Sequence, residues 1–457
     1  MAGETVSLSH REGRENDAKV WGWLPTLYLA EALPYVAINT LSVILYTRMG
    51  VGMADMAFYT GLLYLPWVIK PLWSSFVDIF FTKRLWVIAM QLIMGLCFLG
   101  VAFVLSNSLF FALTLTFFWI AAFSSATHDI AADGYYMLRL NPHQQAAFVG
   151  VRSTFYRLGL LFGSGVLVWL AGWIEEKGIL GITDSHLRIV AAWKTVYIII
   201  GVFLLLACVY HFFFMPVVSE KKSTAKGIRE VLGELGDTLV TFFRKPNIGG
   251  AILFMLFYRL PEAICIKLVA PFLLADRAVG GLGLTTEQLG TANGITGVVA
   301  ILAGGIIGGI AISRQGLKYW LWPMALSLAL PCALYLLLAL LPPAPTMTGF
   351  IWVNIAIFVE QFGYGFGFTA FMLYLIYFSE GPWKTSHYAF CTAFMALGMM
   401  LPGMVAGYIY DFFESLGSLV HIAHPGFILF FAFVLLCSVF TCIACTLIKI
   451  DPAFGKK

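Results

Sequence analysis

The segment Phe118–Arg157 reads FWIAAFSSATHDIAADGYYMLRLNPHQQAAFVGVRSTFYR and places acids and arginines inside apolar sequence. A hydrophobic run continues without a loop signal into Asp129 and Asp133. A short polar turn follows, and a second apolar run carries Arg152 and Arg157. In a membrane span, such a side chain costs roughly 2.5–3.5 kcal/mol on insertion scales and usually faces a cavity or a partner. The segment therefore predicts two adjacent helices whose ionisable residues need an explanation from the rest of the chain.

The composition indicates an integral membrane protein. Hydrophobic residues make up 60% of the chain, charged residues only 11%, and the mean hydropathy is +0.87, whereas soluble domains contain about 25% charged residues. The apolar runs are near-continuous rather than alternating, which is typical of membrane helices and not of a barrel. No basic tract suggests nucleic-acid binding, and the cysteines lie in apolar runs without metal-ligand spacing. We therefore expect no metal site.

The apolar runs predict twelve spans, because a span needs about 20 apolar residues. They cover residues 21–47, 56–77, 84–104, 108–138, 147–174, 188–214, 247–275, 286–311, 317–341, 348–378, 384–412 and 424–449. The polar N-terminal tail has no compact basic region leading to a short apolar core and a cleavage site. We therefore expect the first apolar run to be a retained transmembrane helix.

The positions of lysine and arginine predict that both termini lie in the cytoplasm, because most of these residues fall in the loops on the same side as the N-terminus. The expected organisation is a tail over 1–20, a six-helix bundle over 21–215, a linker over 216–246, a second six-helix bundle over 247–449 and a tail over 450–457. Within the linker, apolar residues at helical spacing predict an interfacial amphipathic helix.

The two halves have related features. Glu31 and Pro34 in span 1 correspond to Glu262 and Pro261 in span 7, and polar turns follow both span 4 and span 10. Two six-helix halves joined by a cytoplasmic loop are typical of the major-facilitator fold, whose binding cavity lies between the halves near the membrane midplane. The predicted fold class is thus an all-α, twelve-span major-facilitator protein.

Four stretches carry a closer resemblance. They are LYLAEALPY at 27–35, LPWVIKPLW at 65–73, SATHDIAAD at 125–133, and YRLPE at 258–262 continuing to PFLL at 271–274. Together they resemble the AmpG-type muropeptide permeases, a major-facilitator branch that also includes acetyl-CoA transporters. His128 stands where that family has glutamine. The resemblance implies import of peptidoglycan-derived amino sugars or muropeptides, of the N-acetylglucosaminyl-anhydro-N-acetylmuramyl type, across the bacterial inner membrane in symport with protons.

The candidate proton-coupling residues are Asp129, Asp133 and Glu31. Asp129 and Asp133 share a helix face, four residues apart. Counting from the inner ends of spans 4 and 5 predicts that Asp133 pairs with Arg152, and Asp129 with Tyr156 and Arg157. A desolvated carboxylate holds its proton, and an approaching guanidinium favours release, so such a pair can couple transport to protons. A static ion pair that locks the two spans is the alternative.

The candidate substrate-binding residues lie in both halves. Polar side chains follow one face of span 1, and span 10 combines amides with aromatic rings that suit acetamido sugars. Cations in spans 2 and 7 suit a carboxylate, although the lysines could instead extend to the interface and Arg259 could pair with Glu262. The predicted set is Tyr28, Tyr35, Asn39, Lys70, Ser125, Arg259, Glu262, Lys267, Asn354, Gln361 and Tyr364. We expect ion coupling mainly in the first half and much of the substrate recognition in the second.

The alternatives are a carrier of another anionic solute, such as an acyl-CoA or a different sugar, and a membrane enzyme acting on lipid-linked sugars with Asp129 and Asp133 as acid and base. No nucleotide-binding loop or nucleophile elbow is present in the sequence. We therefore expect no enzymatic activity and no cofactor. The expected partners are a small-molecule substrate, protons and the lipid bilayer, with the protein as a monomer.

Overall fold

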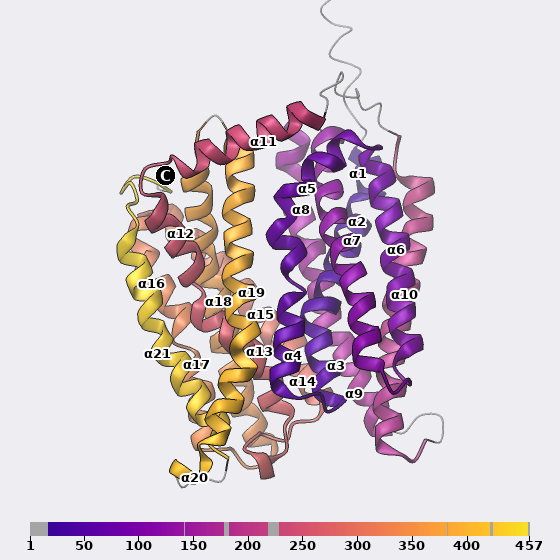
Figure 1. Ribbon diagram of the computed structural model, residues 1–457, viewed down its shortest axis with the longest axis vertical. Helices are drawn as coiled ribbons and strands as arrows, with labels where there is room; N and C mark the ends of the chain where they lie inside the picture. The colour runs from indigo at the N-terminus through magenta and orange to yellow at the C-terminus, as the bar shows by residue number, and fades with distance from the viewer. Residues whose placement is uncertain are drawn as a thin grey trace, which may run out of the picture. The chain divides into compact units, whose positions relative to one another are not determined.

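The computed structural model describes residues 17–140, 142–177, 182–217, 228–381, 383–420 and 424–455. Helices and their connections make up this part of the chain, with no strand among the described residues (Figure 1). The all-α prediction is confirmed. Most of the N-terminal tail, the first part of the predicted linker and the end of the C-terminal tail lie outside the described residues.

The helices of the first half follow the predicted spans. Their bounds are α1 Asp17–Trp21, α2 Leu24–Val36, α3 Ser42–Arg48, α4 Met53–Leu62, α5 Leu65–Ile79, α6 Lys83–Val104, α7 Phe110–Arg139, α8 Pro142–Leu161, α9 Val168–Lys177 and α10 Ser185–Phe214. Two π-helical segments, η1 Ala37–Leu41 and η2 Phe162–Leu167, join α2 to α3 and α8 to α9. Spans 1 and 5 therefore continue through a local widening of the helix, a feature often found at functional sites.

The second half has the same kind of elements. Their bounds are α11 Ile228–Phe243, α12 Ile248–Phe257, α13 Leu260–Leu274, the 3-10 helix η4 Arg277–Val279, α14 Thr286–Thr291, the π segment η5 Ala292–Gly297, α15 Val298–Gln315, α16 Leu317–Ala329, α17 Cys332–Leu340, α18 Met347–Ser379, α19 Lys384–Ser415, α20 Gly417–Val420 and α21 Gly426–Leu447.

Ten continuous helical stretches of the described chain are long and apolar enough to cross a membrane. The other two predicted spans, 56–77 and 247–275, each consist of two shorter helices, α4 with α5 and α12 with α13. Pro66 and Pro261 explain the interruptions, because proline has no N–H for the carbonyl four residues earlier. In the second case, the Thr441 hydroxyl donates to the Phe257 carbonyl at 3.3 Å. The twelve predicted spans are thus accounted for.

The chain forms two compact units. The first comprises residues up to 38, 72–163 and 194–227, and the second comprises 39–71, 164–193 and 228–457. Each has its own buried apolar core, around Tyr28 and Tyr135 in the first unit and around Tyr258 and Phe371 in the second. The second unit includes the end of span 1, most of span 2, the end of span 5 and the start of span 6. The boundaries of the two six-helix bundles stay a prediction.

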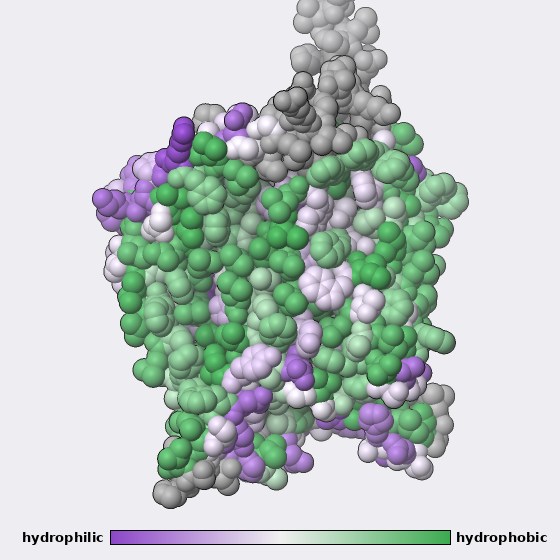
Figure 2. All heavy atoms as spheres, viewed as in Figure 1, coloured by the Kyte–Doolittle hydropathy of each residue, from purple (hydrophilic) through white to green (hydrophobic). Residues whose placement is uncertain are grey.

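The linker helix α11 packs onto the second unit across the end of α19 (Figure 1). Phe242 is fully buried there, with ring contacts to Phe378, Phe390 and Phe394. The Lys245 ammonium donates to the carbonyls of Phe378 and Glu380 at 2.5 and 2.8 Å, at the end of α18. On the face shown in Figure 2, hydrophobic residues cover most of the helices and hydrophilic residues gather near their ends, as expected for spans in a bilayer.

Candidate functional site

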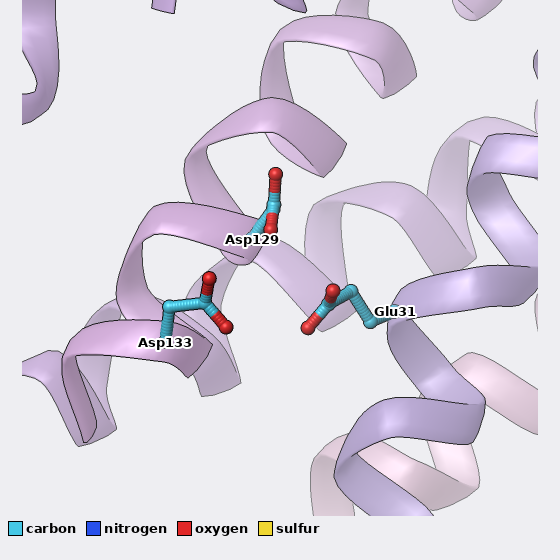
Figure 3. Close-up of side chains that lie close together, drawn as sticks. All are labelled: Glu31, Asp129 and Asp133. Carbon is cyan, nitrogen blue, oxygen red and sulfur yellow. The ribbon is translucent and has the colours of Figure 1, made fainter. Parts of the chain in front are cut away.

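Three carboxylates meet inside the first unit, and we call them the acid cluster: Glu31, Asp129 and Asp133. Asp129 and Asp133 lie one turn apart on α7, and Glu31 reaches them from α2 (Figure 3). Carboxylate oxygens from the three residues lie within 4.8 Å of one another. Glu31 is only 7% exposed. The structure therefore brings together the three residues predicted to couple protons.

Arg152 on α8 balances part of this charge. Its Nη2 lies 2.6 Å from Asp133 Oδ1, and the Tyr28 hydroxyl donates to the same oxygen at 3.3 Å. The guanidinium lies over the rings of Tyr28 and Tyr136, at 4.6 and 5.5 Å from their centroids. The contact between Asp133 and Arg152, predicted from the level of each residue in its helix, is present.

The spacing of the three carboxylates would allow the cluster to bind a positive charge. Like charges a few ångströms apart repel strongly where water is scarce, and a bound cation or proton reduces this repulsion. A hard cation could also bind three carboxylates at this spacing, but the Arg152 guanidinium already occupies one face of Asp133. A proton satisfies the cluster without displacing the arginine.

A small cavity of about 200 Å³ lies beside the cluster and is lined by Glu31, Arg152, Ser153, Tyr156 and Arg157. Tyr156 and Arg157, which were predicted to pair with Asp129 in a gate between spans 4 and 5, thus face the same space as Glu31. Their pairing with Asp129 stays a prediction. Ser153 was absent from the predicted set because a single serine beside an arginine gives no distinctive sequence signal.

A chain of hydrogen bonds begins at His128, the residue before Asp129, and crosses the first unit. The sequence did not predict it. His128 Nε2 lies 3.0 Å from the Gln91 amide, whose other atom lies 2.9 Å from His211 Nδ1. His211 Nε2 lies 2.9 Å from the Thr26 hydroxyl, which donates to the Trp23 carbonyl. The chain links α2, α6, α7 and α10. The sequence gives only one indication of this chain, namely that two histidines and one glutamine lie in separate apolar runs.

Both histidines can be neutral in this chain. With the Gln91 amide as it stands, its oxygen accepts from His211 Nδ1 and its nitrogen donates to His128 Nε2. His211 Nε2 then accepts the proton of the Thr26 hydroxyl. With the amide reversed, each of these hydrogen bonds runs in the opposite direction, and the Thr26 hydroxyl donates to the Trp23 carbonyl. In either order, each imidazole carries one proton and is neutral.

In the second unit, Arg259 and Glu262 form a buried bidentate ion pair, with contacts of 2.7 Å from Nε and 2.5 Å from Nη2. The guanidinium lies 5.3 Å from the ring centroid of Tyr364 and 4.9 Å from that of Phe368. Arg259 sits at the break between α12 and α13. The ion pair between Arg259 and Glu262, which was the alternative to a role in substrate binding, is therefore present. A role of these two residues in substrate binding stays a prediction.

Lys267 on α13 is only 4% exposed. Its ammonium donates to the Thr60 hydroxyl at 3.3 Å and lies 5.4 Å from the ring centroid of Tyr64. No aspartate or glutamate among the described residues forms an ion pair with it. A lysine that reaches the interface would expose its amine to water, so the burial of Lys267 does not fit that alternative, and its part in substrate binding stays a prediction.

The predicted amides of span 10 are engaged within the helix bundle. Asn354 accepts from the Thr296 hydroxyl at 2.6 Å and donates to the Phe350 carbonyl at 2.8 Å. Gln361 donates to its neighbour Glu360 at 2.6 Å. The remaining predicted residues occupy helices of the two units: Tyr35 and Asn39 in span 1, Lys70 on α5 and Ser125 on α7.

A second charged group, which the sequence did not predict, surrounds the buried Glu175 on α9. Its carboxylate accepts from the Arg48 guanidinium on α3, at 2.9 Å from Nη2. It also accepts from the Trp193 indole at 3.1 Å and from the Thr286 hydroxyl at 2.7 Å. A single acid thus connects spans 1, 5, 6 and 8.

The profile of the Major Facilitator Superfamily matches residues 24–383. The anhydromuropeptide permease of Escherichia coli (strain K12) is 25% identical over 357 residues, which cover 76% of this chain and 65% of that protein. The match thus spans less than two thirds of the permease's length. Putative transporter AmpG 4 of Rickettsia conorii is 22% identical over 387 residues, covering 81% and 85%.

Solved transporters share the fold. A mutant of the nucleoside transporter NupG superposes with a TM-score of 0.69 at 14% identity, covering 93% of this chain and 99% of that one. An inward-facing bacterial homolog of the human lysosomal transporter Spinster gives 0.67 at 15% identity, covering 95% and 98%. The fold prediction and the resemblance to AmpG-type permeases are confirmed, and the chain belongs to the Major Facilitator Superfamily.

Proposed function

We propose that the chain is a proton-coupled importer of peptidoglycan-derived amino sugars or muropeptides. The observation that carries the proposal is the acid cluster, in which three carboxylates share a site with one paired arginine. The similarity to an anhydromuropeptide permease supports the substrate class. The protein would lie in the bacterial inner membrane as a monomer, with both termini in the cytoplasm.

In this proposal, a proton enters the acid cluster at Asp129 or Glu31 while Asp133 stays paired with Arg152. Protonation removes the repulsion that opposes a closed arrangement around the small cavity. Movement of the cavity-lining Arg157 toward Asp129 then favours release of the proton on the cytoplasmic side. Substrate and proton move together because each lowers the cost of the conformational change that carries the other.

The substrate would be anionic. Lys267 offers a buried ammonium without an acidic partner among the described residues, and a lactyl or peptide carboxylate would satisfy it. The aromatic rings around Arg259 supply flat apolar surfaces for sugar rings. The same buried ammonium favours a second candidate function, transport of another anionic solute such as an acyl-CoA or an acidic sugar.

The Glu175 group would seal the periplasmic side. Given cytoplasmic termini, the Arg48 end of span 1 lies on the periplasmic side, where Glu175 holds spans from both halves together. Opening toward the periplasm would require these hydrogen bonds to break. Once they had formed again, the substrate could leave only toward the cytoplasm. Alternating access of this kind is the general mechanism of two-half carriers.

The test is uptake of labelled anhydromuropeptide into vesicles that contain the purified protein under an imposed pH gradient. We expect accumulation that a protonophore abolishes, and Asp129→Asn should remove accumulation while leaving substrate exchange. Normal accumulation by this variant would make Asp129 structural. Competition by N-acetylmuramic acid, acyl-CoA and acidic sugars then separates the two candidate substrate classes. Product formation in detergent without a gradient would instead indicate an enzyme.

A further inference from the structure

A second carboxylate pair lies in the second unit and has features in common with the acid cluster. Glu360 sits near the middle of the 33-residue helix α18, which is span 10. The acid that interacts with it electrostatically is Glu262 on α13. In the first unit, Glu31 of span 1 faces two acids of span 4. In each half, an acid of the first span thus meets an acid of the fourth.

Only one of these two acids has a cationic partner among the described residues. Arg259 binds Glu262 through two hydrogen bonds, of 2.7 and 2.5 Å. No lysine, arginine or histidine of the described chain forms an ion pair with Glu360. Its hydrogen-bond donor is the Gln361 amide, at 2.6 Å from Oε2. An ionised Glu360 near the centre of a span would therefore be costly.

Tyr335 supplies an independent observation. Its side chain on α17 is 0% exposed, and its hydroxyl has no partner of standard hydrogen-bond geometry. The hydroxyl faces the Glu360 carboxyl. A buried hydroxyl without a hydrogen-bond partner is costly, and the Glu360 carboxyl is the group that can supply one, because a carboxyl accepts a hydrogen bond and, when protonated, also donates one. The Cys265 thiol on α13 is the other titratable group that interacts with Glu360.

We propose that Glu360 is a second proton-binding site, in which Glu360 and Glu262 alternate as partners of Arg259. While Arg259 is bound to Glu262, Glu360 holds a proton on Oε1, donates it to the Tyr335 oxygen and accepts from Gln361 on Oε2. When Arg259 moves to Glu360, this proton passes to water and Glu262 takes one up. The inference rests on the proposed proton coupling and extends it to the second half, where the sequence suggested mainly substrate recognition.

The infrared spectrum of the reconstituted wild-type protein tests the site without a transported substrate. A protonated carboxyl has a C=O stretching band separate from that of a carboxylate. We expect such a band at neutral pH, its loss as the pH rises, and its absence in Glu360→Gln, which is isosteric with the protonated acid. The exposed acid Asp55 provides the matched control, Asp55→Asn, which should keep the band. A wild-type spectrum without a Glu360-dependent band overturns the proposal.

Tyr335→Phe keeps the carboxyl and removes its acceptor, so it should shift the frequency of the band. Tyr335→Phe can also replace Glu360→Gln in the test if the latter variant cannot be purified, because an unshifted band would exclude the proposed contact. In vesicles, Glu360→Gln should lose gradient-driven accumulation and retain exchange, and unimpaired accumulation overturns a role in coupling. If the wild type does not transport muropeptides, the proposed function fails, whereas the infrared titration still decides the assignment of Glu360.

Discussion

The carboxylate of Glu175 accepts a hydrogen bond from the hydroxyl of Thr286 at 2.7 Å, which joins the end of span 5 to the start of span 8. This contact depends on an unusually close approach of the two backbones. A Cβ added to Gly172 would lie 2.0 Å from the Glu287 nitrogen, and one added to Gly290 would lie 2.2 Å from the Trp169 nitrogen. Glycines in both helices therefore allow the acid and the hydroxyl to meet.

Gly290→Val is expected to prevent this approach, because its side chain would overlap the backbone of α9. Overpacking of this kind costs about 1–3 kcal/mol or more, which would shift the equilibrium toward a state open at this end. The measurement is alkylation, by a membrane-impermeant reagent, of a cysteine placed at the buried Leu289 in a chain without its eight native cysteines. We expect faster alkylation in Gly290→Val.

Gly309→Val is the matched control in the same span, because nothing lies within 4 Å of a Cβ added there. It should alkylate at the parental rate. Equal alkylation rates in the parent protein, Gly290→Val and Gly309→Val would show that the contact between α9 and α14 does not limit access to the cysteine at position 289.

The ion pair between Asp133 and Arg152 should behave as a coupled unit. Each single reversal, Asp133→Arg or Arg152→Asp, places two like charges at positions whose opposite charges now lie 2.6 Å apart. Hydrogen bonds to charged groups contribute roughly 1.5–3 kcal/mol, and because both side chains are about one-third exposed, we expect each reversal to cost an amount near the lower end of this range. The double reversal should recover expression and thermal stability. A double variant no more stable than the worse single variant would argue against a direct contact.

The sequence allowed the spans and this pairing to be predicted, because each depends on local periodicity. Apolar run length defines a span, and helix geometry places Asp133 level with Arg152 across a short turn. Glu31 was predicted as a further proton-coupling candidate because it is an acid within an apolar span near a proline, but its approach to Asp129 and Asp133 was not predicted. These inferences need only one helix or one hairpin at a time.

The missed groups join helices that are distant in the sequence. Glu175 lies near the end of its span among polar residues, where an acid is ordinary, and its partners Arg48 and Thr286 are more than 100 positions away. The proposed contact between Glu360 and Tyr335 depends on the packing of α17 against α18. The periodicity of apolar side chains identifies the buried face of each helix. It does not give the rotation of two distant helices about their axes, or their relative shift along the membrane normal, where they pack together.

Lys267→Met should weaken uptake of anionic substrates specifically. The substitution keeps the volume of the side chain and removes an ammonium that lacks an acidic partner, so the protein should fold normally. Loss of a charged hydrogen bond of roughly 1.5–3 kcal/mol predicts about a ten- to hundredfold rise in KM for a carboxylate substrate. The measurement is uptake of paired substrates with and without the carboxyl group. Lys318→Met, at an exposed position, controls for net charge, and an equal loss for both substrates would assign Lys267 a structural role.

Gln91→Leu should separate a structural role of the buried hydrogen-bond chain from a proton relay. Leucine fills a similar volume but leaves the ring nitrogens of His128 and His211 without their shared partner. We expect a loss of about 1–3 kcal/mol in stability, the cost of unsatisfied buried polar groups, measured as a lower Tm. Uptake per folded molecule should stay at the wild-type level if the chain is structural, because both histidines are then buried, neutral groups that only pack the first unit. A stable, folded variant that has lost proton-driven accumulation would instead identify the chain as a path for protons to Asp129.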